Sequence, residues 1–92
     1  MNTTDRLKEL NNLFLRKTFA LRAATVSDYF SEHFDQVSYS ERSFSRDIKA
    51  LKEHLAERYP SLEETEGDLI RYSKSENRFY YIRDDISAFP SF

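Results

Sequence analysis

Apolar residues recur every three or four positions through most of the first 58 residues, a period that is typical of amphipathic helices. The first such stretch begins at Thr4 and continues to about residue 17, with Thr3 or Thr4 as its expected N-cap. Leu7, Leu10 and Phe14 then fall on one face. This spacing predicts a first helix with one buried side.

A second helical pattern of about ten residues begins at Thr25, after an ambiguous connector over residues 18–24. Thr25 is the expected N-cap, because Asp28 follows three positions later in a variant of the capping box. Val26, Tyr29 and Phe30 form the apolar stripe of this predicted second helix.

The third helical pattern is the longest and runs from about Ser40 to Arg58, after a short connector over residues 35–39. Either Ser38 or Ser40 suits its N-cap. Pro60 should end it, since a proline disfavours helical backbone in the residue before it.

The pattern changes after Pro60. Two runs rich in aromatic and β-branched residues, Leu69–Tyr72 and Phe79–Ile82, flank the polar turn Lys74–Asn77. They predict an antiparallel hairpin with a loop of four or five residues. Three helices followed by this two-stranded antiparallel hairpin predict the α+β class and a winged helix-turn-helix, over residues 1–85, with a C-terminal tail or linker over residues 86–92. The expected core comprises Leu7, Leu10, Phe14, Val26, Phe30, Phe44, Ile48, Leu51 and Leu55.

The third predicted helix has a basic exposed face. Arg42, Arg46 and Lys49 lie within about 60° of one another and nearly opposite the apolar stripe, with Ser43 and Ser45 beside them. Arginines and hydroxyls at such a helix start can bond to bases or phosphates in the major groove. The same pattern equally fits an ordinary solvated face.

A resemblance to a known family rests on the nine residues SERSFSRDI, which begin at Ser40. This run is similar to the recognition-helix pattern of winged-helix bacterial repressors of the deoxyribose-repressor type and of WYL-domain regulators. The later runs KALKEHL, RFYYI and RDDISAF also resemble those proteins. The resemblance implies sequence-specific binding of double-stranded DNA, with Arg42, Ser43 and Arg46 as contacts. Asp47 lies toward the buried side of the helix, so we expect it to hold the helix in place.

Two departures from the family matter. Its members usually have a second, effector-sensing domain, and these 92 residues leave no room for one. The chain is therefore an isolated domain of a longer protein or a small stand-alone regulator. The formal net charge of -2 is also acidic for a DNA-binding protein, so DNA binding requires a local basic patch.

Further basic residues lie outside the third helix. Lys74 and Arg78 belong to the hairpin turn, where they would contact the DNA backbone or remain in solvent. A second basic group near the first connector comprises Arg16, Lys17 and Arg22 and is more typical of plain surface. The full set of expected DNA-binding residues is Ser40, Arg42, Ser43, Ser45, Arg46, Lys49, Lys74 and Arg78.

Other chemistry has little support in the sequence. Cysteine is absent, and His33 and His54 have no metal-like spacing, so we expect no metal and no cofactor. No nucleophile motif or glycine-rich loop is present, so we expect no enzyme activity. Without an apolar run of roughly 20 residues, we expect no membrane span and a cytoplasmic location. The C-terminal aromatics predict either packing onto the helices or a homodimer surface, and they are Tyr80, Tyr81, Phe89 and Phe92.

The leading hypothesis from the sequence is therefore a DNA-binding transcriptional regulator, of the repressor type that the resemblance implies. The alternative is a protein-interaction winged helix that does not bind DNA, and the acidic net charge favours it. The sequence specifies neither the operator nor an effector.

Overall fold

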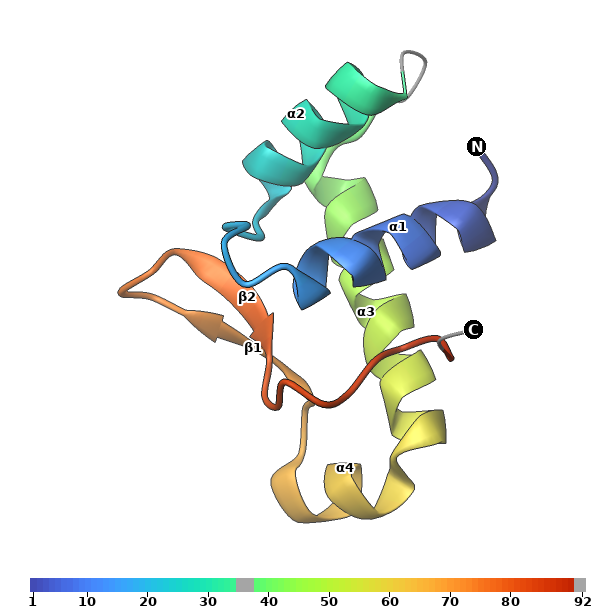
Figure 1. Cartoon of the computed structure of the whole chain (residues 1–92), viewed down its shortest axis with the longest axis vertical. Coiled ribbons are helices and arrows are strands. Elements are labelled where there is room, and N and C mark those ends of the chain that lie inside the picture. Colours follow the sequence, from blue (N-terminus) through green and yellow to red (C-terminus); the bar gives the residue numbers. More distant parts are fainter. Residues whose placement is uncertain (35–37, 91–92) are drawn as a thin grey trace.

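The computed structural model describes residues 1–34 and 38–90. Within these residues the chain forms an α+β fold, which confirms the class expected from the sequence. Four helices come first along the chain, and a two-stranded antiparallel hairpin follows them (Figure 1). The elements are α1 (Thr3–Leu15), α2 (Ala23–His33), α3 (Glu41–Arg58), α4 (Pro60–Glu66), β1 (Ile70–Ser73) and β2 (Arg78–Tyr81).

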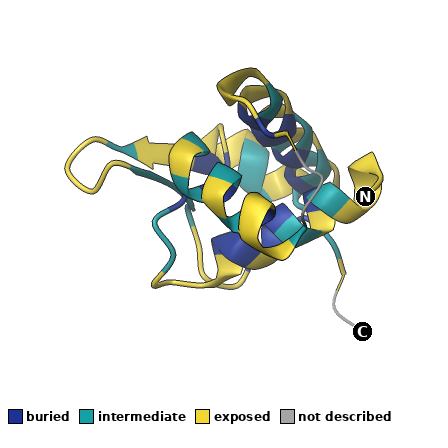
Figure 2. Cartoon of the chain, turned by 90° about the horizontal axis from the view of Figure 1, so that it is seen from above, coloured by how far each residue is buried: buried dark blue, intermediate teal, exposed yellow. Residues whose placement is uncertain are grey.

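Helix α3 is the central element, and α1, α2 and α4 each contact it. Figure 1 shows α2 near the N-terminal end of α3, α1 crossing its middle, and α4 at its C-terminal end. Buried and exposed residues alternate around α1, α2 and α3, as their apolar periodicity requires (Figure 2), whereas α4 has no buried residue. All nine core residues expected from the sequence are buried: Leu7, Leu10, Phe14, Val26, Phe30, Phe44, Ile48, Leu51 and Leu55.

The hairpin has the predicted position and the shorter of the two predicted loops. Ser73 pairs with Arg78, so residues 74–77 form a four-residue connection. Two aromatic contacts hold the hairpin against the helices. Tyr81 stacks on Phe14 of α1 with ring centroids 4.3 Å apart, and Phe79 meets Phe44 of α3 edge to face at 5.4 Å.

The connector between α1 and α2 lies along β2. The Phe79 N–H donates a hydrogen bond of 2.7 Å to the carbonyl oxygen of Leu21. Leu21 is buried, although the sequence pattern left residues 18–24 ambiguous. One backbone hydrogen bond thus joins this connector to the hairpin at the edge of β2 that β1 does not use.

The sequence predicts three helices, and this count is wrong because α4 follows α3 directly. Tyr59, with φ −129° and ψ 60°, interrupts the helical backbone, and Pro60 then occupies the first turn of the new helix. A proline is well tolerated there, because its fixed φ suits a helix and its missing N–H would have had no partner. Pro60 therefore marks both the end of α3 and the start of α4.

Two predicted helix starts also differ from the structure. The N-cap of α1 is Asn2, whose side chain accepts a hydrogen bond from the Asp5 N–H, rather than Thr3 or Thr4. Helix α2 begins at Ala23, and the Thr25 hydroxyl accepts a hydrogen bond of 3.2 Å from the Arg22 N–H. Thr25 thus stabilises this helix start from inside the first turn. Residues 35–37 of the predicted second connector lie outside the described residues.

A buried asparagine joins α1 to the residues after the hairpin. The Asn11 side-chain oxygen accepts hydrogen bonds from the Tyr81 hydroxyl at 2.6 Å and from the Ala88 N–H at 2.9 Å. Its amide group donates to the Ser87 hydroxyl at 2.9 Å. Ile86 and Ala88 are buried, so this segment, which the sequence places in a tail or linker, packs with the helices.

Candidate nucleic-acid interface

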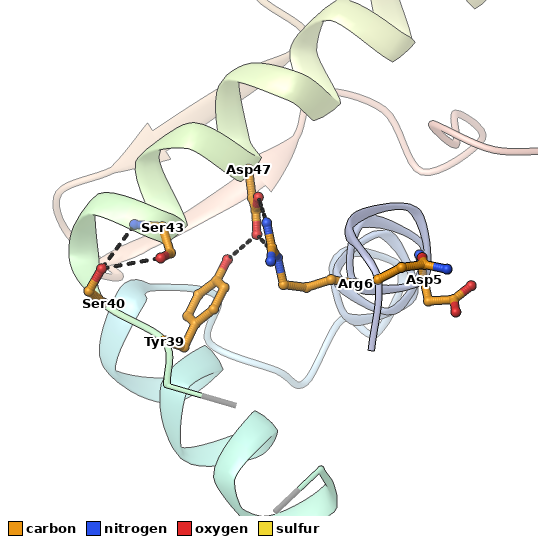
Figure 3. A network of polar contacts seen from close by, with 7 residues as sticks. Asp5, Arg6, Tyr39, Ser40, Ser43 and Asp47 are labelled. Atoms are coloured by element: carbon orange, nitrogen blue, oxygen red, sulfur yellow. Dashed lines mark hydrogen bonds and ion pairs between the residues drawn. The ribbon is translucent and has the colours of Figure 1, made fainter. Parts of the chain in front are cut away.

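The start of α3 is capped by Ser40, the second of the two serines that the sequence offered. Its hydroxyl oxygen accepts a hydrogen bond of 3.1 Å from the Ser43 N–H, and the Ser43 hydroxyl lies 3.2 Å away (Figure 3). Capping satisfies an amide that would otherwise have no partner within the helix. These two hydroxyls are thus engaged in holding the first turn of α3.

The outward face of α3 carries the basic residues that the sequence singled out. Arg42, Ser45, Arg46 and Lys49 are all exposed, on the side of the helix away from the buried stripe. Among the described residues, ion pairs join Arg6 to Asp47, Lys17 to Asp84, Lys52 to Asp68 and Arg83 to Asp85. The three cations of this face are in none of them. Further along the same face, the exposed residues Glu53 and Glu57 are acidic.

The inward face of the same helix carries a buried carboxylate. Both oxygens of Asp47 accept hydrogen bonds from the Arg6 guanidinium of α1, at 2.8 Å and 2.9 Å. The Tyr39 hydroxyl, just before the N-cap, donates to Asp47 at 2.7 Å. Figure 3 shows Arg6 and Tyr39 converging on Asp47 from two separate segments. The positioning role expected for Asp47 has three contacts that could perform it.

Arg6 and Tyr39 keep the protons that they donate to Asp47. Burial, and then the hydrogen bond to Asp47, raise the pKa of Tyr39 far above its usual value, so its hydroxyl remains a donor. The pKa of Arg6 is raised, mainly by its hydrogen bond to Asp47. An arginine side chain stays charged in proteins in any case. The Asp47 side chain is only 3% exposed, which shields these contacts from solvent.

The two cations of the hairpin lie in different environments. Lys74 is exposed in the turn, where a phosphate could reach it. Arg78 is half-buried, and its guanidinium donates a hydrogen bond of 3.2 Å to the carbonyl oxygen of Lys17. Its Nε is buried and has no partner among the described residues. The structure therefore directs Arg78 toward the α1–α2 connector, while Lys74 remains available at the turn.

The second basic group forms contacts within the protein. Lys17 pairs with Asp84 at 2.9 Å, and Arg22 donates to the carbonyl oxygen of Asn77 at 3.2 Å. The Arg16 guanidinium lies 5.9 Å from the centre of the Tyr29 ring. These contacts fit the plain surface role that the sequence favoured for this group.

The C-terminal aromatics differ in how they pack. Tyr81 is buried against α1, and the half-buried Phe89 lies 4.9 Å from the His54 ring. Tyr80 is also half-buried, whereas Phe92 lies outside the described residues. Packing onto the helices thus accounts for Tyr81 and Phe89, and the homodimer surface stays a prediction.

The sequence pattern did not single out Arg6 or Tyr39 for any role. Because Asp47 lies on the buried side of its helix and a buried charge requires partners, a hydrogen-bond donor is expected to face it. The donors, however, lie 41 and 8 positions away along the chain. Arg6 reaches Asp47 because α1 packs against α3, and this packing is what distinguishes Arg6 from the other cations of the sequence.

The described residues offer neither a metal site nor a membrane span. Across residues 1–34 and 38–90, no three histidine, cysteine, aspartate or glutamate side chains are grouped as metal ligands. None of the described helices has the length and apolarity needed to cross a bilayer. Comparison with protein-family models, curated proteins and solved structures finds no match to this chain.

Proposed function

We propose that this protein is a winged helix-turn-helix regulator that binds double-stranded DNA with α3 in the major groove. The observation that carries the proposal is the exposed basic start of α3. Arg42, Arg46 and Lys49 face solvent there, and no described carboxylate pairs with them. Surface cations that find no partner in their own chain are free to contact phosphates or bases.

The dimensions of this basic segment suit the major groove. With its side chains an α-helix is about 10–12 Å across, and from Arg42 to Lys49 it rises by about 10 Å, at roughly 1.5 Å per residue. The major groove of B-DNA is about 12 Å wide and admits one helix. Arg42 or Arg46 would then bond to guanine or to phosphate, and Ser45 would contact either a base or the backbone. The acidic residues Glu53 and Glu57 lie beyond this segment, where the helix would leave the duplex.

The arrangement of the other elements supports the same proposal. Helices α2 and α3 are consecutive, and the hairpin packs against α3 through Phe79 and Phe44. The hydrogen bond from Phe79 to Leu21 adds a third segment beside β2. The hairpin would act as the wing, with Lys74 as its phosphate contact. Helix α4 is an addition to the three-helix pattern, located at the far end of α3 (Figure 1).

The competing proposal is a protein-interaction domain of similar shape that does not bind DNA. The formal net charge of -2 favours it, because non-specific DNA binding usually depends on a broadly positive surface. Neither proposal includes a catalytic step, a metal or a cofactor. The resemblance to bacterial repressors implies that such a transcriptional regulator would act in the cytoplasm of a bacterium.

A double variant tests DNA binding directly. Duplexes would first be selected from random DNA with the wild-type protein at fixed salt, and affinity measured by fluorescence anisotropy. Arg42→Ala combined with Arg46→Ala should weaken binding by at least about fivefold, since one bidentate contact contributes about 1–3 kcal/mol.

The matched control removes two cations outside the proposed interface. Arg58, in the last turn of α3, and Lys8, on α1, are exposed and belong to none of the ion pairs among the described residues, so Arg58→Ala combined with Lys8→Ala loses the same charge. It should bind nearly as tightly as the wild type. Equal weakening by both pairs would show a general charge effect. Failure to select any duplex would contradict the proposal and favour the protein-interaction alternative.

A further inference from the structure

The contact between α1 and α3 combines an apolar surface with one directional polar cluster. The buried face of α3 consists of Phe44, Ile48, Leu51 and Leu55. The hydrophobic effect that favours their burial is not directional. Apolar cores that keep their volume and pattern tolerate repacking and lose a unique arrangement before they lose stability. Apolar packing therefore sets which side of α3 is buried, whereas a small axial rotation needs a further constraint.

The cluster of Arg6, Tyr39 and Asp47 restricts that rotation. A guanidinium that holds both oxygens of a carboxylate requires a defined relative orientation of the two groups. Tyr39 adds a third hydrogen bond from the segment that leads into α3. The carboxylate is therefore held from two directions, by α1 and by the chain just before the N-cap (Figure 3).

The same helix turn carries the proposed contact residues. Asp47 follows Arg46 directly, so the backbone that the cluster holds is also the backbone that orients the Arg46 side chain. A turn of α3 by about 20° would move an atom ~6 Å from the helix axis by about 2 Å. Hydrogen bonds to base edges do not tolerate such a displacement. Lysines and arginines that contact phosphates tolerate it better, because they act over longer distances.

We infer that Arg6 and Tyr39 are positioning residues for DNA-sequence discrimination, acting through Asp47 on the rotation of α3. This inference rests on the proposed function, since it assigns a role to residues behind the same interface. It goes beyond holding the fold together. According to this inference, the affinity for any duplex depends on the surface cations. The preference for one sequence depends on the buried cluster as well.

The experiment compares two conservative variants that each lose one buried hydroxyl. Tyr39 and Tyr81 are both 8% exposed, and their hydroxyls donate at 2.7 Å and 2.6 Å. Tyr39→Phe removes a bond to Asp47, whereas Tyr81→Phe removes a bond to Asn11, away from α3. For each protein, anisotropy would measure the ratio of affinities for the selected duplex and for a duplex with scrambled bases.

Tyr39→Phe should lower this ratio by about tenfold while binding to the scrambled duplex and its salt dependence stay unchanged. Tyr81→Phe should keep the wild-type ratio even if it lowers stability. Arg6→Lys provides a second variant, because lysine keeps the charge but loses the two-pronged geometry, and it should act like Tyr39→Phe. Circular dichroism would confirm that each variant is folded.

The possible failures can be told apart. If the wild type prefers the selected duplex and both Tyr39→Phe and Arg6→Lys keep its ratio, the positioning role is wrong and the proposed function stands. Equal losses in Tyr39→Phe and Tyr81→Phe would mean that the cluster only stabilises the fold, which also overturns the inference. If the wild-type protein discriminates between no duplexes, the proposed function fails and the inference fails with it.

Discussion

Asp47 is a buried carboxylate that accepts three hydrogen bonds, two from Arg6 and one from Tyr39. Burying a charge is costly, and an apolar residue of similar size is often as good for stability. What an apolar residue lacks is direction. The cluster therefore has a physical role that volume and hydrophobicity do not supply, namely a fixed orientation between α1 and α3.

Buried tyrosines give the stability of this protein a defined pH dependence. Burial is the main cause that raises the pKa of both Tyr39 and Tyr81 far above the ordinary value of 10.0. Above about pH 10 the unfolded chain ionises these hydroxyls while the folded chain does not, so alkali favours unfolding. The stabilising contribution is complete below that pH and is lost as the pH rises above it.

We therefore expect the free energy of unfolding, measured with urea, to fall above about pH 10. A variant with both Tyr39→Phe and Tyr81→Phe should be less stable at neutral pH but show a shallower alkaline decline, because two groups that ionise on unfolding are gone. Parallel pH curves for the variant and the wild type would contradict this assignment.

Helix α3 shows how local chemistry defines the start of an element. Two serines precede it, and both matched the preferences for an N-cap in the sequence. Only the hydroxyl of Ser40 accepts from an amide of the first turn, since Ser38 lies two residues too early for that reach. The two positions therefore form a natural matched pair.

Ser40→Ala should lower the free energy of unfolding by about 1 kcal/mol, because the Ser43 N–H loses its partner. Ser38→Ala is the control and should change it little, since Ser38 is exposed and makes no cap. Urea titrations followed by circular dichroism would measure both. A larger loss for Ser38→Ala than for Ser40→Ala would show that the cap is assigned wrongly.

Elements with a clear apolar period could be predicted from the sequence. An element whose boundary depends on one residue with two roles could not. The apolar period placed the core residues of α3, and the two aromatic runs placed the hairpin with its loop. Pro60 suggested only an end, although the same residue starts α4. The partners of Asp47 depend on how α1 packs across α3, and no spacing along the chain encodes that contact.

At the scale of the whole molecule, charge distribution matters more than net charge. The protein is acidic overall, yet four exposed cations lie at the start of α3 and in the hairpin turn. Salt bridges occupy other cations, including Lys17 and Lys52. If the protein binds DNA as proposed, the acidic remainder should oppose binding in other orientations.

The salt dependence of DNA binding would count the cations that contact phosphates. If Arg42, Arg46, Lys49 and Lys74 each neutralise one phosphate, log affinity should fall against log salt with a slope of about −3 to −4. Lys74→Ala should make that slope shallower by about 1, whereas Lys8→Ala, on the exposed side of α1, should not change it. A slope near zero would exclude phosphate contacts.

The hydrogen bond between Phe79 and Leu21 has a consequence for how copies of this protein meet one another. A hairpin normally offers two open edges, and each can recruit a strand from a neighbouring chain. Here the connector before α2 occupies part of one edge, and the other belongs to β1, which has four residues and carries the exposed Arg71. Short, charged edges resist strand addition, so the hairpin can project into solvent without becoming a template for aggregation.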